Sequence, residues 1–451
     1  GDQRSVVSVV FSPDGKLLAT AGADGTARLW DTSGQHKQLA VLKGHQDSVV
    51  SVVFSPDGKL LATAGTDGTA RLWDTSGQHK QLAILKGDQP SLIGVSVVFS
   101  PDGKLLATAG ADGTARLWDT SRQQLALPHG LVLGVIFSPD GKLLATGGTD
   151  GNARLWDTSG QHKQLALLKG HQGTVVSVVF SPDGKLLATG GSDRTVRLWD
   201  TSGQHKQLAL LKGHQFWPVS VVFSPDGRLL ATAGTDGTAR LWDTSGQHKQ
   251  LAVLKGHQGS VHSVVFSPDG KLLATGGTDG TARLWDISGQ HKQLAVLNGD
   301  QRSVSRVVFS LDGKLLATAG GDHTVRLWDT SGQHKQLAVL KGHQDSVVSV
   351  VFSRNGRLLA TAGSDGTARL WNTSGKLLAV LKGHQGQVTS VVFSPDGKLL
   401  ATAGGEATAR LWPVEGLDRV LAVSCGWVRD YLRTNPNVSD RTLCDDVGTR
   451  K

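Results

Sequence analysis

The tripeptide Arg-Leu-Trp recurs along this 451-residue chain, mostly at intervals of 43 residues. Its tryptophans are Trp30, Trp73, Trp118, Trp156, Trp199, Trp242, Trp285, Trp328, Trp371 and Trp412. A fixed period of this length is typical of a chain built from copies of one supersecondary unit. Ten such copies account for the sequence up to about residue 413.

Residues 45–87 show the local structure that each copy is expected to adopt. The runs VVSVVFS and LLATAG are separated by SPDGK, and the runs TARLWD and QLAILKG are divided by TSGQHK. Runs rich in β-branched residues favour strands, and Pro-Asp-Gly favours a tight turn. The sequence therefore predicts four short strands per copy in meander order, and an all-β fold.

Units of this length with a Gly-His start and a Trp-Asp finish resemble the WD-repeat β-propeller family over about nine tenths of the chain. The resemblance implies four-stranded blades whose strands run outward from a central channel. We expect one ring of ten blades over residues 1–413, because a seven-bladed ring would leave three units with exposed edges and apolar faces. Two smaller rings are the alternative.

The resemblance also implies a structural tetrad of His, Thr, Asp and Trp in each complete copy. A buried imidazole and a buried indole N–H both need hydrogen-bond partners, which the hydroxyl and the carboxylate can supply. A set repeated around a ring is expected to stabilise packing and not to catalyse a reaction. The complete sets are His45, Thr63, Asp67, Trp73; His171, Thr189, Asp193, Trp199; His214, Thr232, Asp236, Trp242; His257, Thr275, Asp279, Trp285; and His343, Thr361, Asp365, Trp371.

Some copies depart from this set. Asp2, Asp88 and Asp300 replace the histidine, and Glu406 replaces the aspartate of the last copy. Two carboxylates close together, such as Asp300 and Asp322, would raise one pKa or attract a cation. The favoured alternative is that the extra Asp turns outward or accepts backbone hydrogen bonds, and no metal site is predicted.

Differences between copies collect in the loop after Gly-His-Gln and in the turn around the tetrad Asp, whereas SPDGK and DTSGQHK are nearly constant. Successive turns of a meander alternate between its two ends, so both variable loops are expected on one face. Large apolar residues and arginines in such loops predict a contact patch for a protein or peptide. The candidates are Phe216, Trp217, Pro218, Pro90, Leu92, Ile93, Leu131, Leu133, Arg4, Arg302, Arg194 and His323. The alternative is that Trp217 fills the channel mouth and Pro218 starts a strand.

Residues 414–451 form a separate tail. Apolar residues of the segment GLDRVLAVSCGWVRDYLRTNP recur at helical spacing, which predicts an amphipathic helix ending before Pro436 and packed on the last blade. The segment resembles those that follow WD repeats in large bacterial signalling proteins with nucleotide-switch domains of the STAND or NACHT type, or caspase-like domains. The tenth copy lacks an outer-strand sequence. We expect either a QLAVLK-like segment before Gly1 in a parent protein or a three-stranded blade covered by the tail.

Composition limits the function classes. Methionine is absent, which suggests a processed or partial chain, and no run of about 18 apolar residues predicts a transmembrane helix. Cys425 and Cys444 have no zinc-site spacing, so a cytoplasmic location is expected and no metal or cofactor is predicted. No Walker motif and no nucleophile with a base unique to one copy is present, so an enzyme is not expected.

These features favour a non-catalytic recognition or scaffold module. By resemblance it would be the ligand-sensing part of a larger bacterial signalling or defence protein, joined to upstream domains and to no membrane. The alternative is a propeller that binds nucleic acid or another polyanion, since the formal net charge is +9.

Overall fold

The computed structural model describes residues 6–32, 37–86, 96–109, 115–120, 124–127, 132–158, 163–299, 302–384, 386–404 and 409–414. These residues form ten antiparallel sheets, which we call blades 1 to 10 in chain order. Blades 1 to 9 have four strands, and blade 10 has three described strands. Within each blade the strands pair in sequence order, so every blade is the predicted meander.

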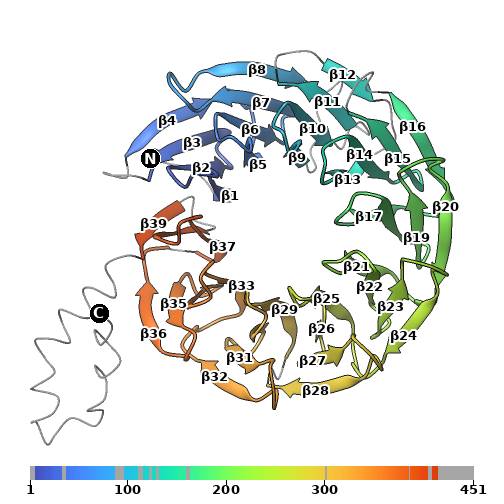
Figure 1. Ribbon diagram of the computed structural model, residues 1–451. Helices are drawn as coiled ribbons and strands as arrows, with labels where there is room; N and C mark the ends of the chain where they lie inside the picture. The colour runs from blue at the N-terminus through green and yellow to red at the C-terminus, as the bar shows by residue number, and fades with distance from the viewer. Residues whose placement is uncertain are drawn as a thin grey trace, which may run out of the picture.

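Equivalent strands occupy equivalent positions from the channel outward (Figure 1). The innermost strands are β1 (Val6–Phe11), β5 (Val49–Phe54), β9 (Ser96–Phe99), β13 (Val132–Phe137), β17 (Val175–Phe180), β21 (Pro218–Phe223), β25 (Val261–Phe266), β29 (Val304–Phe309), β33 (Val347–Phe352) and β37 (Val388–Phe393). The second strands are β2 (Leu17–Gly22), β6 (Leu60–Gly65), β10 (Leu105–Ala109), β14 (Leu143–Gly148), β18 (Leu186–Gly191), β22 (Leu229–Gly234), β26 (Leu272–Gly277), β30 (Leu315–Gly320), β34 (Leu358–Gly363) and β38 (Leu399–Gly404).

The third strands are β3 (Thr26–Asp31), β7 (Thr69–Asp74), β11 (Ala115–Asp119), β15 (Asn152–Asp157), β19 (Thr195–Asp200), β23 (Ala239–Asp243), β27 (Thr281–Asp286), β31 (Val325–Asp329), β35 (Ala368–Asn372) and β39 (Ala409–Pro413). The outer strands are β4 (Gln38–Lys43), β8 (Gln81–Lys86), β12 (Gln124–Leu127), β16 (Gln164–Lys169), β20 (Gln207–Lys212), β24 (Gln250–Leu254), β28 (Gln293–Asn298), β32 (Gln336–Leu340) and β36 (Leu377–Leu381).

The Ser-Pro-Asp-Gly-Lys turn that joins the first two strands is closed by its own side chains. In blade 2, Ser55 Oγ donates a hydrogen bond to Asp57 Oδ1 at 2.6 Å and accepts one from the Leu60 backbone N–H at 2.9 Å. Gly58 supplies the positive φ of 72° that the turn requires. Because the same sequence recurs, nearly every blade begins with the same rigid hairpin.

The blades close into one ring around a central channel (Figure 1). The inner part of the closing junction matches the others, since Val6, Val9 and Phe11 of blade 1 pack in one buried cluster with Ala401 and Ala403 of blade 10. The outer part differs, because blade 10 has no described fourth strand and Trp30 is only half-buried. The predicted single ring of ten blades is therefore confirmed, and two smaller rings are excluded. The predicted C-terminal helix lies outside the described residues.

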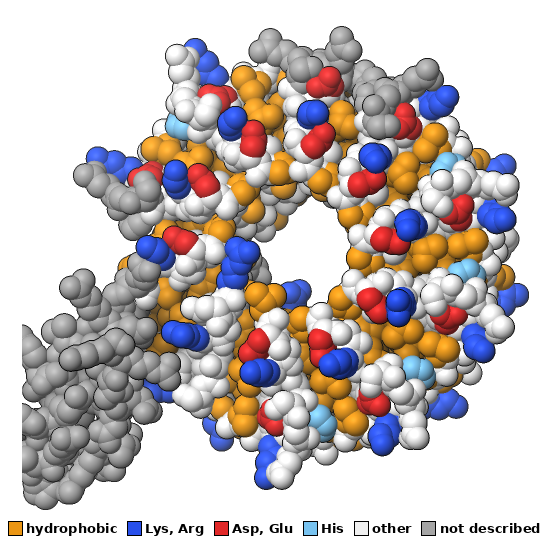
Figure 2. Space-filling view, in the orientation of Figure 1, with side chains coloured by type: hydrophobic (Ala, Val, Ile, Leu, Met, Phe, Trp, Pro, Cys, Tyr) orange, Lys and Arg blue, Asp and Glu red, His pale blue; other side chains and the backbone are white. Residues whose placement is uncertain are grey.

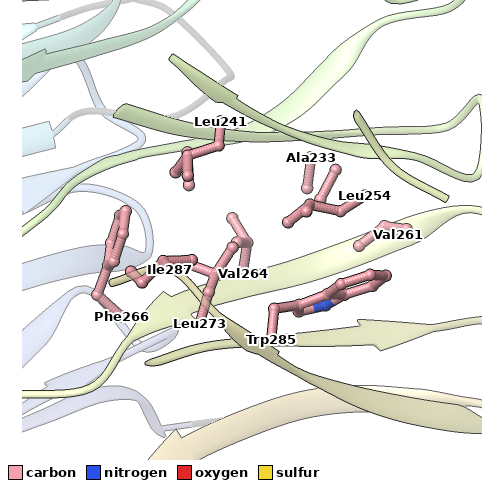
Figure 3. Packing of buried hydrophobic residues seen from close by; sticks show 11 residues of the cluster. Ala233, Leu241, Leu254, Val261, Val264, Phe266, Leu273, Trp285 and Ile287 are labelled. Atoms are coloured by element: carbon pink, nitrogen blue, oxygen red, sulfur yellow. The ribbon is translucent and has the colours of Figure 1, made fainter. Parts of the chain in front are cut away.

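Each junction between blades is a hydrophobic core shared by two sheets. Between blades 6 and 7, Leu241 and Leu254 from one blade pack against Val264, Phe266 and Trp285 from the next (Figure 3). Burying a side chain of this size contributes about 1.5–3 kcal/mol relative to exposure. Repeated junctions of this kind hold the ring together and fix the positions of the loops at each end of the blades.

Candidate binding face

The tetrad residues form a chain of hydrogen bonds inside the blade. In blade 2, Trp73 Nε1 donates to Thr63 Oγ1 at 2.9 Å, Thr63 Oγ1 lies 2.9 Å from His45 Nε2, and His45 Nδ1 lies 3.0 Å from Asp67 Oδ1. An ionised Asp67 can only accept, so His45 donates from Nδ1 and its Nε2 accepts the Thr63 proton. Every polar atom of this chain is thereby satisfied with a neutral imidazole.

The other four predicted sets have the same geometry, with corresponding distances between 2.8 and 3.1 Å. Burial lowers the pKa of His45 below its ordinary value, and the hydrogen bond to Asp67 opposes this shift only in part. Burial alone would raise the pKa of Asp67, but hydrogen bonds from His45 and from two backbone N–H groups hold it below its ordinary value. In blade 7 the same arrangement lowers the pKa of Asp279 to about 2.

Four residues replace a tetrad His or Asp in other copies. Asp2, Asp88, Asp300 and Glu406 lie outside the described residues. Asp322, the expected neighbour of Asp300, forms an ion pair with Arg326 at 2.9 Å. In the described part of the chain, no group of three or more His, Cys, Asp or Glu residues could hold a metal ion.

The tetrad Asp also fixes the two variable loops on one face of the ring, which we call the loop face. Asp67 Oδ2 accepts a hydrogen bond at 2.9 Å from the backbone N–H of Gln46, in the loop after Gly-His. Ser48, in the same loop, donates to the carbonyl oxygen of Ala23 in blade 1 at 3.3 Å. The loop of blade 2 therefore contacts the tetrad turn of its own blade and that of the preceding blade.

Two aromatic side chains project from the loop of blade 6. Phe216 is 57% exposed and Trp217 is 58% exposed, so Trp217 does not fill a gap in the core. Pro218 differs from both, because it is buried and starts strand β21 opposite Gly234. The exposed candidates at this loop are therefore Phe216 and Trp217.

Arg194 belongs to the same part of the face. It takes the place of the tetrad-turn glycine in blade 5, with a φ of 69°, and it is exposed. At the equivalent junction of blades 4 and 5, a methyl group on Gly151 would lie 3.2 Å from the carbonyl oxygen of Gly173. Arg194 and Phe216 occupy these two positions at the junction of blades 5 and 6. The repeat geometry thus places the Cβ of Arg194 next to the backbone of the loop that carries the two exposed aromatic residues.

Arg302 and His323 lie farther along the same arc. Arg302 is exposed in the loop of blade 8, and half-buried His323 is in the turn of that blade. His323 Nδ1 lies 3.8 Å from Asp345 Oδ1 in the loop of blade 9. The candidates with described side chains therefore span blades 5 to 8. Pro90, Leu92, Ile93, Leu131 and Arg4 lie outside the described residues, and Leu133 lies in strand β13.

The opposite face carries the Ser-Pro-Asp-Gly-Lys turns, and we call it the turn face. Figure 2 shows this face, with acidic and basic side chains next to one another around the central opening. Apart from the exchange of lysine for Arg228 in blade 6, two turns differ from the others and were not singled out by the sequence argument, which treated them as nearly constant. Blade 8 has Leu311 in place of proline, and blade 9 reads SRNGR, with Arg354, Asn355 and Arg357. Comparing copies position by position would have found them.

Comparisons with known proteins agree with this architecture. The family described as "IFT122 first beta-propeller" matches residues 5–252, and the family described as "WD domain, G-beta repeat" matches residues 248–286, 291–329, 334–372 and 375–413. A solved structure, described as the computationally designed Ika8 protein, is 25% identical with a TM-score of 0.53, over 71% of this chain and 96% of that chain. No curated protein matches the chain.

The fold and these matches define the class: the chain belongs to the WD-repeat β-propeller family. Propellers of this family generally serve as scaffolds that bind protein partners, and they are typically non-catalytic. Within the described residues, no helix has the length and apolar character needed to cross a membrane.

Proposed function

We propose that this chain is a non-catalytic recognition module that binds a protein or peptide through the loop face of blades 5 to 8. The observation that carries the proposal is the exposed pair Phe216 and Trp217, which stands where most other copies of this loop have small polar residues or an arginine. Aromatic residues and arginine supply most of the hot-spot energy in protein interfaces. Arg194 stands beside this pair, so three such residues fall in one place.

The residues next to Phe216 and Trp217 on the loop face leave room for a partner to contact these two side chains. In blade 7, the next loop along the ring carries Gly259 and Ser260 where blade 6 has the two aromatic residues. A partner could therefore reach the rings without meeting another large side chain on that side. Arg302 and His323 come next on the arc and would contact the polar rim of such a partner.

The proposal includes a cellular role: the ligand-sensing end of a larger bacterial signalling or defence protein in the cytoplasm. Its support is the resemblance of the tail segment to those that follow WD repeats in such proteins. In that setting a bound partner would act through domains that precede the propeller. Sequencing the parent gene upstream of Gly1 tests this part, and an upstream region without any switch or effector domain would overturn it.

The binding surface itself is tested with a variant drawn from the chain's own repeats. Phe216→Asp, Trp217→Ser and Pro218→Val together give blade 6 the loop of blade 2. The tagged propeller is used to isolate its partner from the source organism, and the affinity of the purified pair is then measured. A hot-spot residue contributes at least about 2 kcal/mol, so we expect the loss of at least one such residue to weaken binding by about thirtyfold or more.

The matched control is Leu39→Gln, which removes a 41% exposed leucine from the outer strand of blade 1. We expect this variant to bind the partner like the unaltered chain. Equal affinity of the blade 6 variant and the unaltered chain would overturn the proposal. Recovery of nucleic acid in place of protein, with binding that weakens steeply as salt rises, would establish the polyanion alternative.

A further inference from the structure

On the turn face, most turns make the same contact with the preceding blade, and the turns of blades 9 and 10 do not. At eight junctions, the turn glycine of one blade packs on the turn proline of the preceding blade. A methyl group on Gly58, for example, would lie 3.5 Å from Pro13 Cδ, and the equivalent distances at the other seven junctions are 3.1 to 3.6 Å. These contacts between turn glycine and turn proline link neighbouring turns around most of the channel, and we call this series of contacts the collar.

The collar is interrupted at two consecutive junctions. Among the described residues, nothing lies within 4 Å of a methyl group placed on Gly356 of blade 9 or on Gly397 of blade 10. The cause is in the sequence, because the preceding blades have Leu311 and Arg354 where the others have proline. Leu311 points away from the collar and is 63% exposed, and Arg354 is exposed as well.

The charge of blade 9 changes in the same region. In the first turn and the outer link of blade 2, the charged groups are Asp57, Lys59, Asp74 and Lys80, which sum to zero. The equivalent groups of blade 9 are Arg354, Arg357 and Lys376, which sum to +3. Figure 2 shows basic but no acidic side chains over β33 to β36, in agreement with this count.

The loss of negative charge leaves the structure of the turn intact. Asn355 takes the place of the turn aspartate and still accepts from Ser353 Oγ at 2.8 Å and from the Arg357 N–H at 3.1 Å. Asn372 takes the place of the link aspartate and accepts from Ser374 Oγ and the Lys376 N–H, both at 2.8 Å. In the turn, the amide thus keeps the hydrogen bonds of the carboxylate, so the turn of blade 9 differs from the others mainly in charge. The link differs in length as well, because it is two residues shorter than in blade 2, and its amide keeps only the hydrogen bond from the serine hydroxyl.

We propose that Leu311, Arg354 and Arg357 form a second docking surface, on the face opposite to the candidate loops, for an acidic protein segment that carries an apolar side chain. The two guanidinium groups would pair with carboxylates of the segment, for which their planar donor geometry is suited. The apolar side chain would pack on Leu311 beside the open junction.

Charge complementarity favours an acidic segment over a long polyanion. The excess positive charge is confined to one blade, and the neighbouring turns on this face carry Asp312 with Lys314 and Asp396 with Lys398, which sum to zero. Nucleic acid binds through rows of cations that follow its phosphates, and no excess of cations continues on either side of blade 9. A short peptide can place its carboxylates on blade 9 alone.

The experiment measures the anisotropy of a fluorescein-labelled peptide of repeated Glu-Glu-Leu triplets, with the whole propeller as the binding protein. One variant, Arg354→Pro with Asn355→Asp and Arg357→Lys, restores in blade 9 the turn of the other blades. A second variant, Leu311→Pro, restores the turn of blade 8. We expect the first to weaken binding at least about tenfold and the second at least about threefold. Both sequences already occur in folded blades, and thermal unfolding verifies that the variants fold.

Control peptides with Gln in place of Glu, or Gly in place of Leu, are expected to bind at least about tenfold and threefold more weakly. The converse variant, Pro56→Arg with Asp57→Asn and Lys59→Arg, transfers the turn of blade 9 to blade 2 and should add a second, weaker binding site, because blade 1 has Pro13 where blade 8 has Leu311. No binding of the acidic peptide, or binding that the blade 9 variant leaves unchanged, would overturn the proposal. Tighter binding of a single-stranded DNA oligonucleotide at the same arginines would overturn it in favour of a polyanion site.

Discussion

Arg326 Nη2 lies 2.9 Å from Asp322 Oδ2 in blade 8, whereas the equivalent atoms of Arg71 and Asp67 in blade 2 are 4.0 Å apart. The close distance also occurs in blades 1 and 4, at 3.2 Å between Arg28 and Asp24 and at 2.6 Å between Arg154 and Asp150. Blades 1 and 8 have Asp where the tetrad histidine would stand, and blade 4 has no Gly-His-Gln at that point. Where the histidine is missing, the arginine of the third strand approaches the tetrad Asp.

This difference predicts unequal coupling energies. A double-mutant cycle with Asp322→Asn and Arg326→Met should give a coupling of about 2 kcal/mol, because the pair is close and largely buried. The matched cycle with Asp67→Asn and Arg71→Met should give less than about 1 kcal/mol, since His45 already pairs with Asp67. Urea unfolding of the variants measures both couplings. Equal values would show that the arginine does not take the place of the histidine.

The buried histidines of the tetrads predict that the free energy of unfolding decreases at acidic pH. Burial lowers the pKa of His45, His171, His214, His257 and His343 in the folded state, so between their ordinary and their folded pKa values the unfolded chain binds more protons. Stability should therefore fall as the pH drops below about 6.5, by up to about 1.4 kcal/mol per pH unit for each histidine that is protonated only when unfolded. The lowered pKa of the tetrad Asp residues gives the same sign at lower pH, since their contribution is lost as the pH falls through the folded values.

Urea unfolding at a series of pH values from 7 to 5 checks this expectation. The variant His45→Gln should be less stable at pH 7 and should show a smaller loss on acidification, because one titrating group has been removed. Stability that stays constant from pH 7 to pH 5 would show that the pKa values of the tetrad histidines do not differ between the folded and the unfolded chain, and stability that rises would show that these histidines are already protonated in the folded chain.

The exposure of Phe216 and Trp217 predicts that their replacement has little effect on the stability of the fold. Replacing Phe216 by Asp and Trp217 by Ser should change the free energy of unfolding by no more than about 0.5 kcal/mol, as for most surface substitutions. Leu241→Ala, at a fully buried position of the same blade, should cost about 2–5 kcal/mol. Chemical unfolding compares the two. A loss of several kcal/mol in the loop variant would mean that the aromatic residues stabilise the fold and are not available to a partner.

The interrupted collar predicts a stabilising substitution. Leu311→Pro should raise the free energy of unfolding by roughly 0.4–1 kcal/mol, because the turn already has the form that accepts proline in eight other blades and the unfolded chain becomes less flexible. The midpoint of urea unfolding measures the gain. Destabilisation would mean that the backbone of this turn differs from that of its equivalents.

The sequence was sufficient to predict the strands, the tetrads and the single ring, because each depends on local chemistry repeated many times. The response of Arg326 to the missing histidine was not predicted, since the approach of a side chain to its neighbour depends on packing that periodicity does not describe. The proximity of Arg194 to Phe216 was missed for a similar reason: they are on different blades, and only the order of blades in the ring makes them neighbours. The turns of blades 8 and 9 were visible in the sequence and were overlooked.

Ring closure through the inner strands has a consequence for inheritance. Because Val6, Val9 and Phe11 of the first blade meet Ala401 and Ala403 of the last as their equivalents meet at other junctions, a gene could gain or lose one repeat by unequal recombination and still encode compatible inner edges. Residues found in a single blade, such as Trp217 and Arg354, would then change their positions around the ring relative to one another as repeats are duplicated or deleted. Related genes should differ in repeat number and in the angle between these marked blades.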